Sequence, residues 1–141
     1  MRLSARSRYG IYAMIDLARS VGEGPQTVRA IALRQCVPEP YLEQLLAPLR
    51  RSKLILSARG AAGGYALARS AKDIRVGDIL RALEGEIRVT DCAIDPDACE
   101  RAGECAPRVL WERLNQAIDR VLDETTLSDL VMPNTMGGIY E

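Results

Sequence analysis

Two closely spaced prolines in the segment Val37-Pro38-Glu39-Pro40 divide the first third of the chain into separate helices. Pro38 disfavours a helical conformation at Val37, whereas Pro40 suits the first turn of a new helix. Upstream of this segment, Thr27 is a good N-cap for the preceding helix. The chain is therefore expected to form a helix, a tight turn and a second helix.

Apolar residues recur at helical spacing on both sides of that turn. An earlier helix is indicated by Ile11, Met14, Ile15 and Ala18, and is stopped by Gly22 and Gly24. The helix after the prolines is expected to bury one face formed by Leu42, Leu45, Leu46 and Leu49. Pro48 lacks a backbone N–H, so this helix should kink or end early there. Because the chain contains no Phe, the core should be aliphatic.

A hairpin with a basic tip is predicted next. Residues 54–58 and 65–68 read as short strands around the turn Arg59-Gly-Ala-Ala-Gly-Gly64. This turn lacks the Lys-Ser/Thr pair of a phosphate-binding loop and leads into a strand, so nucleotide binding is rejected. Val76, Ile79, Leu80 and Leu83 then indicate a helix that Gly85 closes. The predicted fold class is mainly α with a small β-hairpin wing: a winged helix-turn-helix domain.

A longer helix begins after Pro107 and carries apolar residues close to a heptad repeat, namely Leu110, Leu114, Ala117, Ile118, Val121 and Leu122. It could pack on its own domain, but its position after a complete small domain favours a homodimer, with Trp111 available to anchor the interface. We divide the chain into a winged helix-turn-helix domain (1–85), a cysteine-bearing loop (86–106), a dimerisation helix with a short terminal helix (107–131) and a tail (132–141).

The charges are distributed very unevenly along the chain. Residues 1–75 hold 13 Lys and Arg against 5 Asp and Glu, a net +8, whereas residues 76–141 hold 6 against 14, a net −8. Some of these charges are simply solvated, but a change of sign at mid-chain favours double-stranded DNA as the partner of the first half. The sequence shows neither a signal peptide nor a run long enough to span a membrane, which predicts a cytoplasmic protein and no membrane partner.

The helix after the prolines and the hairpin supply the candidate DNA contacts. Tyr41, Glu43 and Gln44 lie in the first turns of that helix, where Gln can pair with adenine and Glu can accept from cytosine. They could instead form an ordinary polar helix face. A cationic group suited to phosphates follows, formed by Arg50, Arg51 and Lys53. Arg59 on the wing could enter a narrow minor groove.

Three cysteines, Cys92, Cys99 and Cys105, lie in one acidic loop. In a reducing cytosol, such thiols are more often metal ligands or redox sensors than disulfides. Their spacing is too wide for a zinc knuckle built on paired Cys-x-x-Cys turns and suits an iron–sulfur cluster. Cys36 stands apart from these three and is expected to be a small buried side chain.

Several segments resemble the winged-helix transcription regulators of the IscR, NsrR and CymR type. The similar segments run from the first residue to about Val131 and include Pro40-Tyr-Leu-Glu-Gln-Leu-Leu46, Arg59-Gly-Ala-Ala-Gly-Gly-Tyr65 and the cysteine loop followed by Leu110-Trp111. The resemblance implies a dimeric bacterial regulator whose third helix enters the major groove and whose wing reaches the minor groove. In the iron–sulfur regulator of this group, the glutamate of the same run restricts the cluster-free form to fewer sites, so Glu43 is expected to add discrimination.

The resemblance also implies that the three cysteines ligate a cluster, with [2Fe–2S] favoured over [4Fe–4S]. Its fourth ligand is unknown, because the position of the histidine used by relatives is Arg108 and the chain has no His. The position of the aspartate used by the nitric-oxide sensor is Arg8. Glu104, Asp91, another carboxylate, or a small molecule or water could complete the set.

Two alternatives remain at this point. The chain could be a cluster-free member of the same group that acts as a thiol-redox or cysteine-metabolism regulator. Its cysteines would then form a redox switch or a zinc site. A small iron–sulfur electron-transfer module would explain the cysteines but not the basic helix and wing. An enzyme is not expected, because no nucleophile or general base can be assembled from a recognisable motif in a chain without His.

Overall fold

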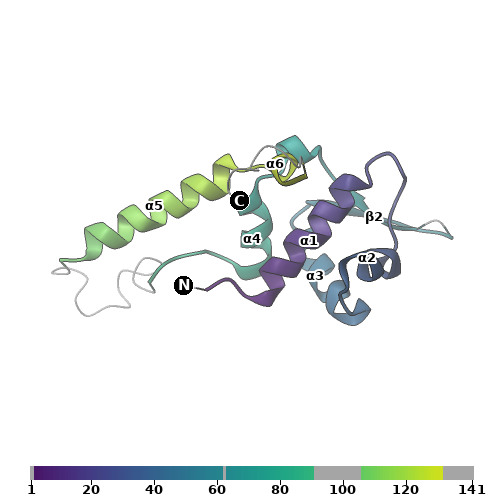
Figure 1. The fold of residues 1–141 in the computed structure, drawn as a ribbon, viewed down its shortest axis with the longest axis horizontal. Helices are drawn as coiled ribbons and strands as arrows, with labels where there is room; N and C mark the ends of the chain where they lie inside the picture. The colour runs from purple at the N-terminus through teal and green to yellow at the C-terminus, as the bar shows by residue number, and fades with distance from the viewer. Residues whose placement is uncertain (1, 62, 91–105, 132–141) are drawn as a thin grey trace, which may run out of the picture.

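The computed structural model describes residues 2–61, 63–90 and 106–131, most of which are helical (Figure 1). The elements follow one another as α1 (Ala5–Arg19), α2 (Val28–Gln35), α3 (Glu39–Arg51), β1 (Ile55–Ala58), β2 (Gly64–Leu67), the 3-10 turn η1 (Ala71–Asp73), α4 (Val76–Glu84), α5 (Arg108–Glu124) and α6 (Leu127–Val131). This order confirms the predicted fold class, mainly α with one two-stranded antiparallel hairpin. No helix in the described ranges is long and apolar enough to cross a membrane.

The core is aliphatic and lies where α1, α2, α3 and α4 meet. The predicted leucine face of α3 is buried as expected, and each of its four leucines is fully inaccessible to solvent. Further fully buried side chains come from every part of the body, among them Met14, Ile31, Leu54, Ile79 and Leu127. Because Leu127 belongs to α6, the chain returns from α5 onto the body of the winged domain.

The start of α2 agrees with the sequence, but its end corrects one expectation. The Thr27 Oγ1 atom accepts a hydrogen bond from the Ala30 N–H at 3.1 Å, so the predicted N-cap is confirmed. Cys36 ends α2 with φ of 55° and is exposed, so its expected burial was wrong. The left-handed backbone conformation of Cys36 changes the direction of the chain, and the next residue, Val37, is buried in the core instead of Cys36.

Pro48 does not terminate α3. The helix continues to Arg51, and the Ser52 N–H still donates to the Pro48 carbonyl at 3.0 Å. The sequence predicted a kink or an early end at Pro48: the early end was wrong, and the kink stays a prediction. Pro48 costs one backbone hydrogen bond, but its ring is buried beside Leu45 and Leu49 on the face that packs into the core. Apolar burial on both sides of the proline offsets the lost hydrogen bond.

The wing is fastened to the body by a third extended segment. β1 and β2 pair antiparallel with Ile55 opposite Leu67. Gln26, just before α2, pairs with Tyr65 through two backbone hydrogen bonds of 2.8 and 2.7 Å. Gly64 makes this approach possible, because a Cβ at that position would collide with the Gln26 carbonyl, and its φ of +146° disfavours other residues. The wing is thus held against the start of the helix-turn-helix.

A buried carboxylate joins α1 to α2. Asp16 is only 4% exposed and accepts hydrogen bonds from the Arg34 Nε and Nη2 atoms at 2.9 and 2.7 Å and from the Gln35 amide at 2.9 Å. Burial opposes ionisation of this carboxyl, but the hydrogen bonds from Arg34 and Gln35, with the nearby positive charge of Arg34, outweigh it and lower the pKa of Asp16. Asp16 therefore stays charged and fixes the angle between these two helices.

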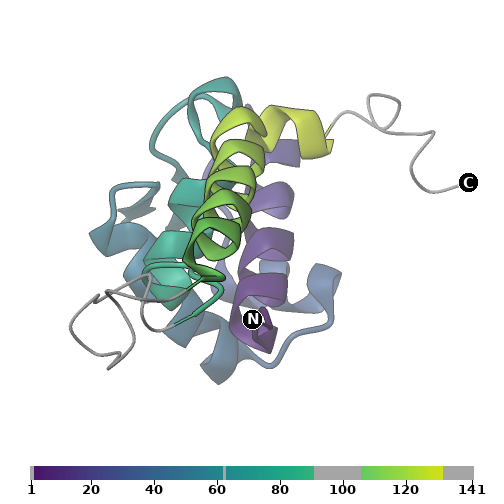
Figure 2. The same ribbon diagram turned by 90° about the vertical axis from the view of Figure 1, so that its left-hand side faces the viewer.

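Ion pairs fasten α5 to α4 along one side. Arg81 pairs with Asp123 at 2.8 Å and with Asp119 at 3.4 Å, and Arg88 also reaches Asp119 at 3.3 Å. Asn115, the buried residue of α5, accepts a hydrogen bond from the Val89 N–H at 2.9 Å. Beyond these contacts α5 projects away from the winged domain, as the two perpendicular views show (Figures 1 and 2). Part of the surface of α5 therefore stays exposed to solvent.

Candidate nucleic-acid interface and dimer helix

The exposed side of α3 carries two of the predicted base-reading residues. Glu43 and Gln44 are exposed, opposite the buried leucines, because positions 42, 45, 46 and 49 turn inward with the helical period. Tyr41 differs from them: it is half-buried, and its ring meets the Tyr9 ring edge-on at 5.9 Å between centroids and 89° between planes. The first turns of α3 therefore offer polar side chains to a ligand and one aromatic ring to α1.

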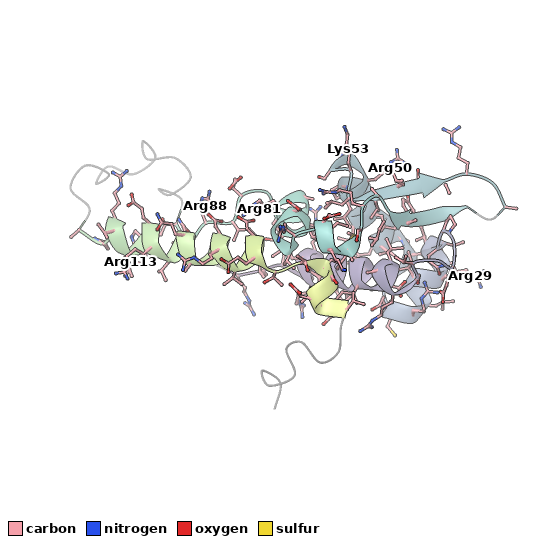
Figure 3. All side chains as sticks on the ribbon, turned by 90° about the horizontal axis from the view of Figure 1, so that it is seen from above. Arg29, Arg50, Lys53, Arg81, Arg88 and Arg113 are labelled. Carbon is pink, nitrogen blue, oxygen red and sulfur yellow. The ribbon has the colours of Figure 1, made fainter. Side chains whose placement is uncertain are left out.

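The basic end of α3 lies beside the wing. Arg50 Nη1 is 3.5 Å from the Ser57 hydroxyl of β1, which brings the two predicted DNA-binding elements together. Arg51 and Lys53 are exposed, and Lys53 turns the chain toward β1 with φ of 61°. In the view from above, Arg50 and Lys53 lie on the half of the molecule that holds the wing, and Arg113 lies at the far end of α5 (Figure 3).

Arg59 stands exposed immediately after β1, where the chain turns at Gly60 with φ of +104°. A side chain at the end of a two-stranded ribbon can enter a groove without displacing core packing. Arg59 thus lies apart from the α3 residues, as a winged interface requires, since the wing and the helix contact separate parts of a duplex. No contact between Arg59 and α3 is needed for both to bind the same duplex.

Arg29 was missed by the sequence reading. It lies in the first turn of α2, two residues after the N-cap Thr27, and it is exposed (Figure 3). The helical period does not single it out, because residue 29 is three positions from the buried Ala32 and neighbours it on the helix surface; the signals that could have found it are its charge and its place just after the N-cap Thr27. A cation there, next to the free N–H groups at a helix start, suits a phosphate oxygen.

The three loop cysteines, Cys92, Cys99 and Cys105, lie outside the described residues, as do Asp91 and Glu104. Among the residues the structure describes, no group of three His, Cys, Asp or Glu side chains could hold a metal ion. The approach to the loop is anchored on α5 through the hydrogen bond from Val89 to Asn115. On the other side, Arg108 donates through Nε to Glu112 at 3.1 Å, so this guanidinium is engaged in an ion pair within α5.

The outer face of α5 is apolar and exposed. Val109, Leu110 and Val121 are 64%, 51% and 63% exposed, and Leu114 is 40% exposed. Near the other end of α5, a groove of about 440 Å³ opens between α1, α4 and α6, with apolar walls that include Leu3, Ile11, Tyr12, Val121, Leu122 and Leu130. An exposed apolar helix face beside an apolar groove marks an interaction surface.

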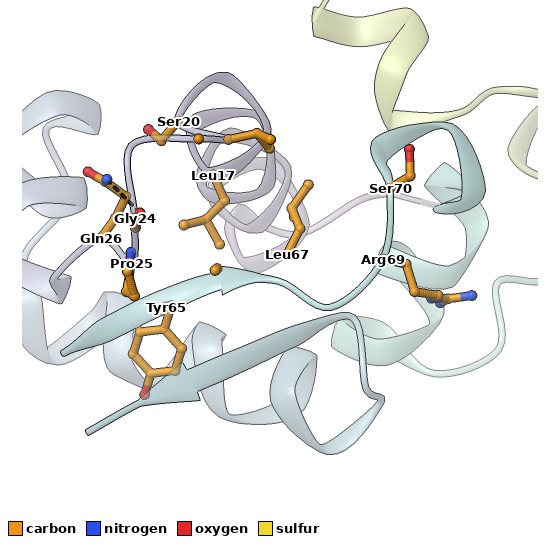
Figure 4. A pocket seen from close by; sticks show the side chains of 12 residues that line it. Leu17, Ser20, Gly24, Pro25, Gln26, Tyr65, Leu67, Arg69 and Ser70 are labelled. Atoms are coloured by element: carbon orange, nitrogen blue, oxygen red, sulfur yellow. Dashed lines mark hydrogen bonds between the residues drawn. The ribbon is translucent and has the colours of Figure 1, made fainter.

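A second hollow lies at the base of the wing and does not resemble a catalytic site. It measures about 320 Å³ between the end of α1, the loop before α2 and β2. Leu17, Tyr65 and Leu67 line it, and the Gln26 side chain turns back to donate to the Gly24 carbonyl at 3.1 Å (Figure 4). Its walls bring together no nucleophile and base.

Comparisons with known proteins agree with this geometry. Residues 3–133 match the Rrf2 family, described as iron-dependent transcriptional regulators. The chain is 45% identical over 130 residues to the HTH-type transcriptional regulator CymR of Bacillus subtilis, which spans 92% of this chain and 89% of that protein. The structure of CymR, the global cysteine regulator of B. subtilis, superposes with a TM-score of 0.79 at 44% identity, covering 93% and 96% of the two chains.

A structure of IscR from T. potens superposes with a TM-score of 0.75 at 43% identity, covering 93% of this chain and 86% of that one. Both relatives are matched along most of their length, through the helix-turn-helix, the wing and α5. These proteins are regulators and not enzymes, in agreement with the sequence reading. The chain therefore belongs to the Rrf2 family of DNA-binding transcriptional regulators.

Proposed function

We propose that this regulator is a cytoplasmic homodimer that binds double-stranded operator DNA through α3 and the wing. The observation that carries the proposal is the contact between Arg50 and Ser57, which sets the basic end of α3 beside the hairpin. Residues 1–85 would form the DNA-binding domain, residues 86–106 the sensing loop and residues 107–131 the dimerisation element. The family membership supports DNA binding, and the exposed α3 face supports this placement of the DNA.

The side chains have separate roles in this proposal. Glu43 and Gln44, with the Tyr41 hydroxyl, would face base edges, because they lie in the first turns of the recognition helix. Arg50 and Arg51 would contact phosphates and so contribute affinity rather than sequence preference. Arg29 and Lys53 would also contact phosphates. Arg59, at the tip of the wing, would enter the minor groove.

Glu43→Ala is expected to reduce discrimination between operator classes by about tenfold. The Glu43 carboxylate is repelled by the DNA phosphates, and this cost is offset only at operators where a cytosine amino group donates a hydrogen bond to it. The Glu43→Ala variant should bind certain operators even when its loop cysteines carry no cluster and are not oxidised. The parent protein should bind those operators only when the loop holds a cluster or its thiols are oxidised. Binding isotherms for both states on two operator classes measure this effect. Glu124→Ala, which removes an exposed carboxylate from α5, is the control, and equal discrimination in parent and Glu43→Ala would make Glu43 a solvated side chain only.

The second copy would seat its α5 against the exposed apolar face and the groove beside it. Burial of Val109, Leu110, Leu114 and Val121 in one seam would remove most of the large apolar surface of α5 from water. A dimer also places two recognition helices on one duplex, which matches operators built from two half-sites.

Operator affinity would respond to the state of Cys92, Cys99 and Cys105, and two chemistries are supported by different observations. The spacing of the thiols supports an iron–sulfur cluster, for which three thiolates are a suitable donor set. A [2Fe–2S] cluster remains favoured over [4Fe–4S], and its fourth ligand would be a group other than a thiolate. Arg108 is unsuited to that role, since a guanidinium stays protonated. The similarity to CymR, the global cysteine regulator of B. subtilis, supports the cluster-free alternative better, in which the thiols themselves report cysteine or redox status.

Anaerobic purification followed by iron and sulfide analysis and absorption spectra separates these chemistries. A cluster-binding protein should contain iron and sulfide that disappear when the three loop cysteines are replaced by Ala, and Cys36→Ala should leave both unchanged. A cluster-free regulator should contain neither, and its operator affinity should change on oxidation or alkylation of the loop thiols. Full iron and sulfide content in the triple variant would contradict the cluster site, and affinity unchanged by either treatment would contradict the thiol switch.

A further inference from the structure

Three tyrosine rings form a continuous series from the apolar groove to the recognition helix. Tyr9 meets Tyr41 of α3 edge-on at 5.9 Å, and it meets Tyr12, one turn along α1, at 6.3 Å with 63° between the rings. The Arg8 guanidinium carbon stands 5.9 Å from the centroid of the Tyr9 ring. Tyr9 is thus the central residue of the series. It contacts Arg8 and Tyr12 on the side of the groove, and it contacts Tyr41 on the side of α3.

The start of α3 has few other side-chain anchors. Its N-cap is Pro38, which provides no side-chain hydrogen bond, and the first helical bond runs from the Leu42 N–H to the Pro38 carbonyl at 3.0 Å. Glu39 and Pro40 are exposed. Tyr41 and the buried Leu42 are therefore the side chains that tie the first turn of α3 to the body. A change at the Tyr9–Tyr41 contact would alter the direction in which Glu43 and Gln44 approach a duplex.

The other end of the series faces the groove. Arg8 and Tyr12 both line it, and Tyr12 is 49% exposed. A segment that fills the groove can therefore contact these two side chains, which are the neighbours of Tyr9. Edge-to-face pairs depend on ring orientation, so a displacement of Tyr12 or Arg8 changes the preferred position of the Tyr9 ring.

We propose that Tyr9 is a positioning residue that transmits occupation of the groove by a second copy of the chain to the first turn of α3. The inference rests on the proposed dimer and DNA interface. In a monomer, Tyr12 faces water and the series ends at an open surface. In a dimer, the second copy covers Tyr12 and Arg8, the rings lose freedom, and α3 is held in one orientation. Dimerisation would then improve operator selectivity in addition to doubling the number of recognition helices.

The test compares parent, Tyr9→Leu and Tyr9→Phe on an operator selected from random-sequence DNA by the parent protein, and on an unrelated duplex at the same salt concentration. Tyr9→Leu is expected to weaken operator binding by about tenfold, the value of one aromatic pair, and to change binding to the unrelated duplex less than about twofold. Tyr9→Phe keeps the ring and should stay within about twofold of the parent. Ile15→Ala, which shortens another partly buried side chain of α1, should lower the melting temperature and leave the operator selectivity intact.

Unchanged selectivity in Tyr9→Leu would overturn the positioning role. An equal loss of selectivity in Ile15→Ala would do the same, because the effect would then be ordinary loss of α1 packing. Sedimentation must show that Tyr9→Leu retains the oligomeric state of the parent, and a Tyr9→Leu protein that dissociates would place Tyr9 in the dimer contact rather than in transmission.

Fluorine NMR on protein labelled with 3-fluorotyrosine tests transmission without DNA. The Tyr41 resonance, assigned with Tyr41→Phe, should shift when Leu114→Glu removes the second copy, and this shift should be absent in the Tyr9→Leu background. A Tyr41 resonance unaffected by dissociation would overturn the coupling. A parent that is already monomeric would overturn coupling through a second copy and also the proposed dimer, while the operator comparison would still decide whether Tyr9 positions α3.

Discussion

Leu114→Glu is expected to convert the regulator to a monomer and to weaken operator binding by roughly 1000-fold. The substitution places a carboxylate in the centre of the apolar face of α5, where the proposed partner helix would bury it without a counter-ion. Two recognition modules joined in one dimer gain about 100- to 10,000-fold over a single module, and this gain is lost when the chains separate. Sedimentation equilibrium and operator-binding isotherms measure the two effects.

Gln116→Glu is the matched control for that variant. Gln116 is also exposed on α5, and the helical period places it on the opposite side of the helix from Leu114, so the substitution introduces the same charge near Val109 at the edge of the apolar face and not at its centre. The control should remain dimeric with nearly parental affinity. A Leu114→Glu protein that stays dimeric, or a monomeric one that keeps parental operator affinity, would show that the dimer does not use this face of α5.

The double substitution Arg50→Ala/Arg51→Ala is expected to weaken DNA binding of the proposed dimer by at least about 100-fold near physiological salt and to reduce the slope of log affinity against log salt by about four. Each arginine that neutralises a phosphate releases about one counter-ion, and each of the two subunits loses two contacts, so about four are removed from the slope. The loss should be similar for operator and unrelated duplexes, because phosphate contacts carry no sequence information. Titrations at several salt concentrations give both quantities.

Arg113→Ala/Arg120→Ala removes the same charge from exposed positions on α5, and Arg113 lies at the end of the molecule far from the wing (Figure 3). It should leave the salt slope almost unchanged, since these positions lie outside the proposed interface. Circular dichroism should show a folded protein in both double variants, because all four side chains are exposed. An unchanged slope in Arg50→Ala/Arg51→Ala would place the DNA on another face of the molecule.

Local rules of the chain predicted most of the fold. Thr27 caps α2 because a hydroxyl at that position satisfies a free N–H of the first turn, and this needs only residues 27–30. The leucine spacing of α3 defined its buried face for the same reason, since a helical period is a property of consecutive residues. The glycine-rich turn between two short apolar segments likewise predicted the hairpin. The order of these elements, with their motifs, was enough to indicate the family.

Contacts between distant segments were decided only by the tertiary structure. The burial of Val37 in place of Cys36, the passage of α3 through Pro48, the pairing of Gln26 with Tyr65 and the contact between Tyr9 and Tyr41 depend on how the helices pack. A proline or a cysteine carries the same local preference in every chain, whereas its outcome depends on neighbours many residues away. Sequence patterns therefore determined which elements form, and the geometry of packing determined which side chains those elements bring together.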